Sequence, residues 1–492
     1  MLKSVLIANR GEIAVRVIAA CQEAGIRTIA VYSDADREAA HVRAADEAYR
    51  LGPAPASESY LNIPAILAVA REHGAEAIHP GYGFLSENAD FAEACEAAGL
   101  IFIGPPASAI RLMGSKTAAK RAVEAAGVLT VPGYAGEARD LRTLQREAER
   151  IGYPIMLKAA AGGGGKGMRA VRAPEDLAEA VAAAQREALA AFGDESVFLE
   201  KLIVAPRHVE FQILADQHGT VLHLGERECS IQRRHQKVVE ESPCVALTPE
   251  LRARMGEAAV RAARAAGYVN AGTCEFLLDG TGNFYFLEMN TRLQVEHPVT
   301  EYVTGLDLVH HQLAIAAGEP LALRQEEITP RGHAIEVRLY AEDPANGYLP
   351  SIGRVLAFEA PRAPGVRVDA GVAAGDEVTV NYDPMLAKLI VGGESRAQAI
   401  QRLCWALDHF AVLGIATNLP LLRGIAAEAD FQAGRTTTAF LEEHDLATAT
   451  HQETGVPAMA LAAGALFEAL GAAPATPASG PFNPWRGGAA LA

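Results

Sequence analysis

One stretch of alternating polar and apolar side chains, residues 284–298, constrains the fold more than any other part of this chain. In an extended strand successive side chains point to opposite faces, so alternate residues share a face. If the strand continues through the stretch, Met289, Leu293 and Val295 point one way and the polar residues point the other. The polar row then consists of Glu288, Asn290, Arg292, Gln294 and Glu296.

A second strand precedes this one, and a glycine-containing turn connects the two. If residues 280–283 form a four-residue hairpin loop, Glu275 lies directly across from Glu288. Two facing carboxylates, with the amide of Asn290 beside them, are oxygen ligands of the kind that Mg2+ or Mn2+ prefers. The sequence therefore predicts a site for a hard divalent cation at this hairpin.

The other charged members of the row suit the chemistry of a small anion. Arg292 can hold such an anion beside the metal, and Glu296 can act as a base. The alternative is one solvated polar strand face. Such a face would favour Lys, Thr and Ser, and it would not need a carboxylate on the neighbouring strand.

Composition limits the class of protein. A chain of 492 residues is too long for one hydrophobic core, so we expect about two to four domains. The formal net charge of −16 argues against nucleic acid as a partner. The six cysteines are scattered without paired spacing, which is typical of reduced thiols in a cytoplasmic protein. The apolar run near Met1 predicts a buried strand. No apolar run approaches the length of a membrane-spanning helix, so no membrane is expected as a partner.

The hydrophobic pattern predicts α/β and α+β regions in succession. Short apolar strands first alternate with helices, which is typical of a doubly wound parallel sheet. A small α/β lobe and long antiparallel strands follow, and then a mixture of strands and helices. A helical pattern at 458–470 and an Ala/Pro-rich linker at 472–480 end the chain. The expected bounds are 1–113, 114–330 (with a lid at about 131–203), 331–445 and 446–492.

Successive glycines follow a buried strand that ends in Lys158. The backbone N–H groups of such a loop can curl around phosphate oxygens, and Lys166 adds positive charge. The loop is not a Walker A motif, because Lys166 is followed by Gly. We expect a mobile, phosphate-covering lid; the alternative, a flexible linker, would not follow a buried strand. The glycines concerned are Gly162, Gly163, Gly164 and Gly165.

Basic residues gather in two further places. Lys158 ends an apolar strand, where a buried ammonium needs an anionic partner such as a nucleotide phosphate. Lys116 fits either a phosphate contact or a solvated helix N-terminus. A short segment of the acidic chain also contains Arg227, Arg233, Arg234, His235 and Lys237. A run of charges is usually a solvated face, but beside the metal site this one suits phosphate and bicarbonate-sized anions.

Several motifs in order make residues 3 to about 441 resemble biotin carboxylase, an ATP-grasp enzyme. The motifs lie at residues 7–13, 79–88, 162–168, 226–243, 288–300 and 341–344. The resemblance implies ATP-dependent carboxylation of biotin on a carrier, with bicarbonate as the carbon source and Mg2+ or Mn2+ as the metal.

The resemblance also implies roles for individual residues. Lys116, Lys158 and the glycine loop would contact ATP phosphates. Positions around the adenine and nucleotide are Glu200, Lys201, Leu202, Ile203, His208, Gln232, His235 and Leu277, with Leu202 standing where relatives often have an aromatic residue. The metal ligands would be Glu275, Glu288 and Asn290, and the bicarbonate site Lys237, Arg292, Gln294 and Val295. Glu296 would be the general base, and Arg338 would stabilise the biotin enolate.

Two other functions stay open on the sequence alone. Another ATP-grasp ligase, joining a carboxylate to an amine or thiol, would not need Arg338 together with the polar row. A non-catalytic nucleotide-binding regulator would tolerate the loss of Glu296 or a metal ligand.

The chain has no biotinylation motif, so the biotin is expected on a separate carrier protein or on a later domain of a longer chain. Residues 480–488 resemble the segment that follows the carboxylase domain in acyl-CoA carboxylase α-subunits. The expected partners are therefore a biotin carboxyl carrier protein or domain, a carboxyltransferase subunit and a second copy of this chain. The acceptor is expected to be an acyl-CoA, or pyruvate if the chain belongs to a pyruvate carboxylase.

Overall fold

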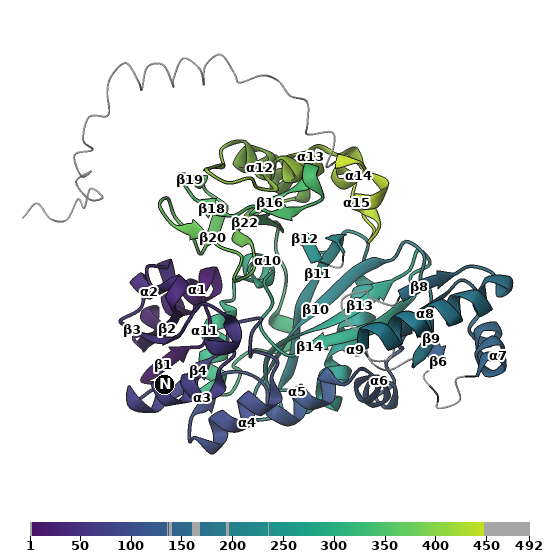
Figure 1. The fold of residues 1–492 in the computed structure, drawn as a ribbon, viewed down its shortest axis with the longest axis horizontal. Helices are drawn as coiled ribbons and strands as arrows, with labels where there is room; N and C mark the ends of the chain where they lie inside the picture. The colour runs from purple at the N-terminus through teal and green to yellow at the C-terminus, as the bar shows by residue number, and fades with distance from the viewer. Residues whose placement is uncertain are drawn as a thin grey trace, which may run out of the picture.

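The computed structural model describes residues 2–134, 136, 140–159, 168–192, 196–234 and 236–446 (Figure 1). The expected glycine loop, His235 and the helix and linker expected at 458–470 and 472–480 lie outside these residues. Within the described part of the chain, no helix is long and apolar enough to cross a membrane.

The first part of the chain forms a parallel sheet covered by helices on both faces, which confirms the expected fold class. The strand order is β3-β2-β1-β4-β5, and all neighbours are parallel. Alternate residues of β1 serve opposite faces: Val5 and Ile7 pack toward α1, and Leu6 packs toward α3 and α4. The elements are β1 (Ser4–Ile7), α1 (Gly11–Glu23), β2 (Arg27–Ser33), α2 (Ala40–Ala44), β3 (Glu47–Gly52), α3 (Ile63–Glu72), β4 (Ala77–His79), α4 (Ala89–Ala97), β5 (Ile101–Phe102) and α5 (Ala107–Gly114).

A small lobe extends away from the N-terminal sheet, at the right of Figure 1. Its sheet has the order β6-β9-β7-β8 with antiparallel neighbours. A core that includes Leu144, Leu157 and Leu199 holds its helices against its strands. The elements here are β6 (Gly133–Tyr134), α7 (Leu141–Ile151), β7 (Ile155–Ala159), β8 (Met168–Val171), α8 (Leu177–Phe192) and β9 (Val197–Lys201). Helix α6 (Lys116–Ala125) precedes the lobe and packs against α5, outside the core of the lobe.

An eight-stranded antiparallel sheet forms the centre of the molecule, in the order β14-β13-β10-β11-β12-β15-β22-β20. Because β12 pairs with β15, the sheet runs without a break past residue 330, where the sequence pattern changes. Its strands are β10 (Arg207–Ala215), β11 (Val221–Arg233), β12 (Gln236–Ser242), β13 (Asn270–Leu278), β14 (Phe284–Asn290), β15 (His333–Tyr340), β20 (Val366–Ala370) and β22 (Met385–Gly393).

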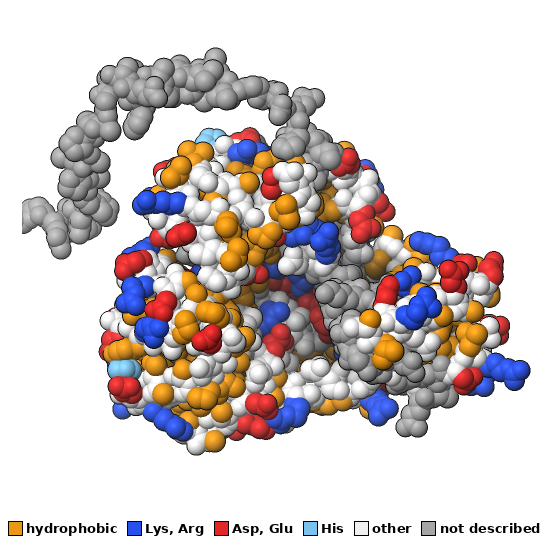
Figure 2. Space-filling view, in the orientation of Figure 1, with side chains coloured by type: hydrophobic (Ala, Val, Ile, Leu, Met, Phe, Trp, Pro, Cys, Tyr) orange, Lys and Arg blue, Asp and Glu red, His pale blue; other side chains and the backbone are white. Residues whose placement is uncertain are grey.

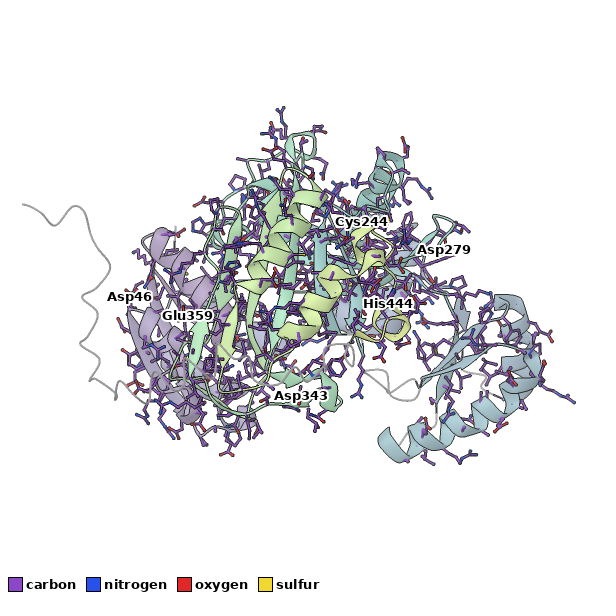
Figure 3. The ribbon with its side chains drawn as sticks, turned by 90° about the horizontal axis from the view of Figure 1, so that it is seen from above. Asp46, Cys244, Asp279, Asp343, Glu359 and His444 are labelled. Carbon is purple, nitrogen blue, oxygen red and sulfur yellow. The ribbon has the colours of Figure 1, made fainter. Side chains whose placement is uncertain are left out.

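Helices cover this central sheet along its whole length. Helix α9 (Pro249–Ala265) packs on β10 and β11, and α10 (His297–Thr304) and α11 (Leu308–Ala316) follow the β13–β14 hairpin. Helices α12 (Arg396–Asp408) and α13 (Leu419–Ala427) pack on β15 and β22. Seen from above, these C-terminal helices lie across the middle of the molecule, with His444 close to their end (Figure 3).

The β13–β14 hairpin places Glu275 opposite Glu288, as the sequence predicts, but it does so by a different route. The register at the turn differs from the expected one, because Leu278, and not Asp279, pairs with Phe284. A β-bulge then inserts Leu287 as one extra residue in β14 and restores the pairing of the two carboxylates. A bulge turns side chains by one position, so it decides which face carries Glu288.

The expected row of polar residues from 288 to 296 does not continue as one strand. Strand β14 ends at Asn290, and Glu296 is the N-cap residue of α10. The prediction of a single extended row was therefore wrong beyond Asn290. The chain leaves the sheet there because Leu293 packs into the core of the N-terminal domain, so tertiary contacts override the local period of two.

Phe276 tests the packing that supports the hairpin. Its buried ring lies edge-on to Phe211, Phe284 and Phe286. Phe276→Ala should lower the free energy of unfolding by about 3–5 kcal/mol, because it leaves a cavity among these rings. Urea unfolding measures this loss, and Tyr285→Ala, at the half-buried neighbouring position, is the control. Equal losses in the two variants would contradict the proposed core.

Candidate active site

The ammonium group of Lys237 organises the centre of the site. Its Nζ on β12 lies 2.5 Å from Glu210 of β10, 2.7 Å from Glu275 of β13 and 2.6 Å from Glu296. All three carboxylates are buried. Burial alone would lower the pKa of Lys237, but the three carboxylates raise that pKa well above its usual range. Lys237 therefore stays charged and favours the ionised forms of Glu275 and Glu296, whereas burial still raises the pKa of Glu210.

Glu296 is held as a carboxylate between two cations. One oxygen accepts from Lys237, and the other accepts from Nη2 of Arg338 at 3.0 Å. Burial alone would raise the pKa of Glu296, but Lys237, Arg338 and Arg227 lower it well below its usual range. Glu296 is consequently ionised at neutral pH, as a proton acceptor must be.

The carboxylate of Glu275 also contacts other polar side chains around the expected metal site. One of its oxygens accepts from the amides of Asn290, at 2.7 Å, and Gln294, at 3.3 Å. Its other oxygen lies 2.9 Å from Nε2 of His208, whose Nδ1 is 2.6 Å from the amide nitrogen of Gln232. Against the effect of burial, Lys237 and His208 lower the pKa of Glu275. The site thus holds the Glu275 carboxylate in place with its charge retained, as a metal ligand requires.

The pKa of Glu288 is shifted in the opposite direction to that of Glu275. The surrounding protein and the neighbouring carboxylate of Glu275 both raise its pKa. Two carboxylates that face one another repel, and a divalent cation between them would remove this repulsion. Together with Asn290, these oxygen donors match the preference of Mg2+ or Mn2+. The residues present therefore fit the metal that the sequence predicts.

Partners of this network line two cavities. The first, of about 460 Å³, is lined by Lys116 and Lys158 and, across from them, by Glu288 and Asn290. The second, of about 360 Å³, is lined by residues of the N-terminal domain, of the segment after β14 and of the C-terminal domain, among them Tyr82, Arg292, Val295, Arg338 and Tyr382. Figure 2 shows the hollow between the domains, with acidic and basic side chains gathered inside it.

The expected nucleotide residues do not all reach the first cavity. Glu200 lines it and accepts from Lys158 at 2.5 Å. The ammonium of Lys201 turns away and donates to the carbonyls of Gly152 and Tyr153, at 2.8 and 2.9 Å. The other expected positions that the structure describes are not among the lining residues of this cavity. They are Leu202, Ile203, His208, Gln232 and Leu277.

Reasoning from the sequence missed Glu87, which joins the N-terminal domain to the site. Its carboxylate accepts from the backbone N–H of Thr291 and from Nε of Arg292, both at 2.9 Å. Arg292 also donates to Gln294 at 3.0 Å, so Glu87 and Gln294 orient the guanidinium together. The only sequence signal was the position of Glu87 in a glycine-containing loop after β4.

The expected basic cluster does not form one surface. Arg227 is fully buried and donates to Glu210 at 2.6 Å and to Gln212 at 2.7 Å, so it is neither solvated nor open to an anion. Arg233 pairs with Glu342 at 2.8 Å. The segment runs from β11 through a turn into β12, so charges that are close in the sequence lie on two strands and in the turn between them. Of the described basic residues in the cluster, Lys237 is the one that lies among the carboxylates.

Comparisons with known proteins identify the family. Three family profiles match in order: "Biotin carboxylase, N-terminal domain" over residues 1–110, "Carbamoyl-phosphate synthase L chain, ATP binding domain" over 115–324 and "Biotin carboxylase C-terminal domain" over 336–443. The chain is 54% identical over 444 residues to biotin carboxylase 2 of Bacillus subtilis, covering 90% of this chain and 100% of that protein. This chain belongs to the biotin carboxylase family, as the motifs predict.

Longer relatives and solved structures agree with this assignment. The methylcrotonoyl-CoA carboxylase subunit alpha of Oryza sativa is 54% identical over 459 residues, which are 92% of this chain but 62% of that subunit. The chain thus spans less than two thirds of that relative. The biotin carboxylase domain dimer of Hydrogenobacter thermophilus 2-oxoglutarate carboxylase, crystallised with MgADP, ADP and bicarbonate, superimposes with a TM-score of 0.85. It is 50% identical and covers 91% of this chain and 98% of that one.

Lys237→Met tests the electrostatic account of the site. In the wild type, Lys237 depresses the pKa of Glu275 and Glu296, so their stabilising contribution is present above the unfolded pKa of about 4.5 and is lost as pH falls. In the variant, burial instead raises both pKa values. The free-energy deficit relative to the wild type, about 3–5 kcal/mol at about pH 8, should therefore shrink toward about pH 5.

Urea unfolding at several pH values measures this deficit. Lys201→Met is the matched control, because the ammonium of Lys201 contacts carbonyls and not carboxylates. A Lys237→Met deficit that is independent of pH, like the one expected for the control, would contradict the assignment.

Proposed function

We propose that this chain carboxylates biotin held on a carrier, using ATP and bicarbonate, as the first half-reaction of an acyl-CoA carboxylase. One observation carries the proposal. The Glu296 carboxylate is held between Lys237 and Arg338, and Arg338 lines the second cavity. Lys237 also binds Glu275, which accepts from Asn290 in the wall of the cavity lined by Lys116 and Lys158. A base in this place can serve phosphoryl transfer on one side and carboxyl transfer on the other.

ATP would occupy the first cavity. Lys116 and Lys158 would neutralise its phosphates, and the glycine loop would cover them. Glu275, Glu288 and Asn290 would hold Mg2+, which when bound neutralises the charge of the transferring phosphoryl group. Glu200 would lie at the inner end of the nucleotide site, where Lys158 already holds it.

Bicarbonate would bind at Arg292, Gln294, Val295 and Lys237. Arg292 offers a guanidinium oriented by Glu87 and Gln294, which suits a planar oxyanion. Glu296 would remove the bicarbonate proton, and the bicarbonate oxygen would attack the γ-phosphate to give carboxyphosphate and ADP.

Carboxyl transfer would follow in the second cavity. Carboxyphosphate breaks to CO2 and phosphate, and the phosphate takes the ureido proton of biotin. The ureido nitrogen then attacks CO2 while Arg338 stabilises the negative charge on the ureido oxygen. The guanidinium of Arg338 lines the cavity and is fixed from the protein side, so it is already oriented for this role.

The partners follow from the relatives. A biotin carboxyl carrier protein or domain and a carboxyltransferase subunit are proposed, because the longer relatives are α-subunits of methylcrotonoyl-CoA carboxylase. A dimer of this chain is supported by the dimeric carboxylase domain from Hydrogenobacter. We propose a cytoplasmic location from the scattered cysteines, and domain bounds of 1–113, 114–330, 331–445 and 446–492. Co-purification with a carboxyltransferase subunit tests the assembly.

ADP release that requires both bicarbonate and biotin is the direct test of the reaction. Another ATP-grasp ligase would require a different acceptor, and a nucleotide-binding regulator would release no ADP. Formation of carboxybiotin from labelled bicarbonate confirms the product, and its absence in the presence of ATP, Mg2+ and biotin would exclude the proposed function.

Glu296→Gln tests the base. The amide keeps the shape of the side chain but cannot accept the bicarbonate proton. Bicarbonate-dependent ATP cleavage should fall by roughly a hundredfold or more. Steady-state ADP release measures the rate, and circular dichroism confirms folding. A rate equal to that of the wild type would show that another group is the base.

Arg338→Gln tests the separation of the two chemical steps. Arg338 lines the second cavity and not the first, so its loss should reduce biotin carboxylation by about tenfold more than bicarbonate-dependent ATP cleavage. Parallel assays of ADP and carboxybiotin give the ratio. Equal losses in both assays would assign Arg338 to the ATP half of the site.

A further inference from the structure

Arg338 has a second carboxylate partner that no step above uses. Its Nε donates to Glu240 of β12 at 2.6 Å, while its Nη2 donates to Glu296 at 3.0 Å. The other oxygen of Glu240 is buried and has no hydrogen-bond partner among the described residues. One guanidinium is therefore shared between the proposed base and a fully buried acid that is not among the lining residues of either cavity.

Further ionisable groups surround Glu240. Glu336 is paired with it across the β12–β15 ladder, and both oxygens of Glu336 are buried without a hydrogen-bond partner in the described part of the chain. Lys388 of β22 lies across from Arg338 and donates to the carbonyl of Val295 at 2.7 Å. The pKa of Glu240 is shifted by the charges of Arg338 from β15, Glu296 from the segment before α10 and Lys237 from its own strand. The charge of Glu240 in turn raises the pKa of Glu336 on β15 and of the thiol of Cys229 on β11.

The protonation of the two acids differs. Burial raises the pKa of Glu336 well above its usual range, which favours its neutral form. Burial also raises the pKa of Glu240, to about 7, with Arg338 opposing the shift. Glu240 is therefore the member of the pair whose charge can change under working conditions.

The proposed reaction changes the charge balance around Arg338. When Glu296 takes the bicarbonate proton, its carboxylate becomes neutral and its hold on Nη2 of Arg338 weakens. Glu240 is then the carboxylate that still binds the guanidinium, through Nε. Nη2 becomes available to the ureido oxygen in the second cavity at the step at which negative charge develops there.

We propose that Glu240 is a positioning residue for carboxyl transfer. It anchors Arg338 through Nε, so that the guanidinium stays in place when Glu296 is protonated and Nη2 can bind biotin instead. This inference rests on the proposed function and adds a link between its two chemical steps. It does not require Glu240 to touch substrate.

Glu240→Gln tests the anchor, because the amide oxygen can still accept from Nε but has no charge. Carboxybiotin formation should fall by about tenfold, the size expected for loss of one charge-assisted hydrogen bond. Bicarbonate-dependent ATP cleavage should fall by less than about threefold, because its proposed residues are retained. The ratio of carboxybiotin to ADP is therefore the readout.

The pH profile gives a second readout that a purely structural role would not change. In the wild type the ratio should fall as pH drops through about 7, as Glu240 takes up its proton. In Glu240→Gln the ratio should be low and independent of pH. Glu336→Gln is the matched control: neither oxygen of Glu336 has a hydrogen-bond partner among the described residues, so Glu336 does not hold Arg338. Both rates and the pH profile should therefore stay within about twofold of the wild type.

Several outcomes would overturn the inference. Equal losses of both activities in Glu240→Gln, or a ratio and profile like those of Glu336→Gln, would show that Glu240 does not act through Arg338. If Glu240→Gln does not fold, a wild-type ratio that is constant between about pH 6 and about pH 8 overturns the inference by itself. A wild-type enzyme that forms no carboxybiotin would instead refute the proposed function, so the two failures are distinct.

Discussion

The site depends on the contact between one ammonium group and three buried carboxylates. Glu210, Glu275 and Glu296 come from different parts of the central sheet and its following helix, and Lys237 joins them. Isolated carboxylates would be neutral in such an environment, because burial raises their pKa. The lysine makes it possible to keep a base and a metal ligand charged in the interior, and both proposed chemical steps require these charges.

The continuous central sheet extends this arrangement toward a second cavity. Because β12 pairs with β15, Lys237 and Glu240 on one strand lie next to Arg338 on the other. The N-terminal domain closes the site from outside, through the hydrogen bonds of Glu87 to Thr291 and Arg292. Residues that line the two cavities are thus linked by one network of charges, in which Lys237 and Arg338 share the carboxylate of Glu296.

Several site predictions depended on local pattern, and their outcomes differ for physical reasons. Glu275 does face Glu288, although the loop and the bulge at Leu287 were not foreseen, because a bulge depends on packing and not on strand period. The basic segment looked like one anion-binding cluster. In the structure Arg227 is instead a buried partner of Glu210, since a sequence does not state which charges will be paired inside.

The sequence alone determined the family, the parallel N-terminal sheet and the residue types needed for a metal, a phosphate and a small anion. Periodicity and motif order carry this information because they reflect local backbone geometry. Only the tertiary structure decided that Glu87 orients Arg292, that Lys201 turns away from the nucleotide cavity and that Glu240 shares Arg338 with Glu296. Those contacts join strands and loops far apart in the chain, and the balance of burial and charge at each of them exists only after the domains have packed together.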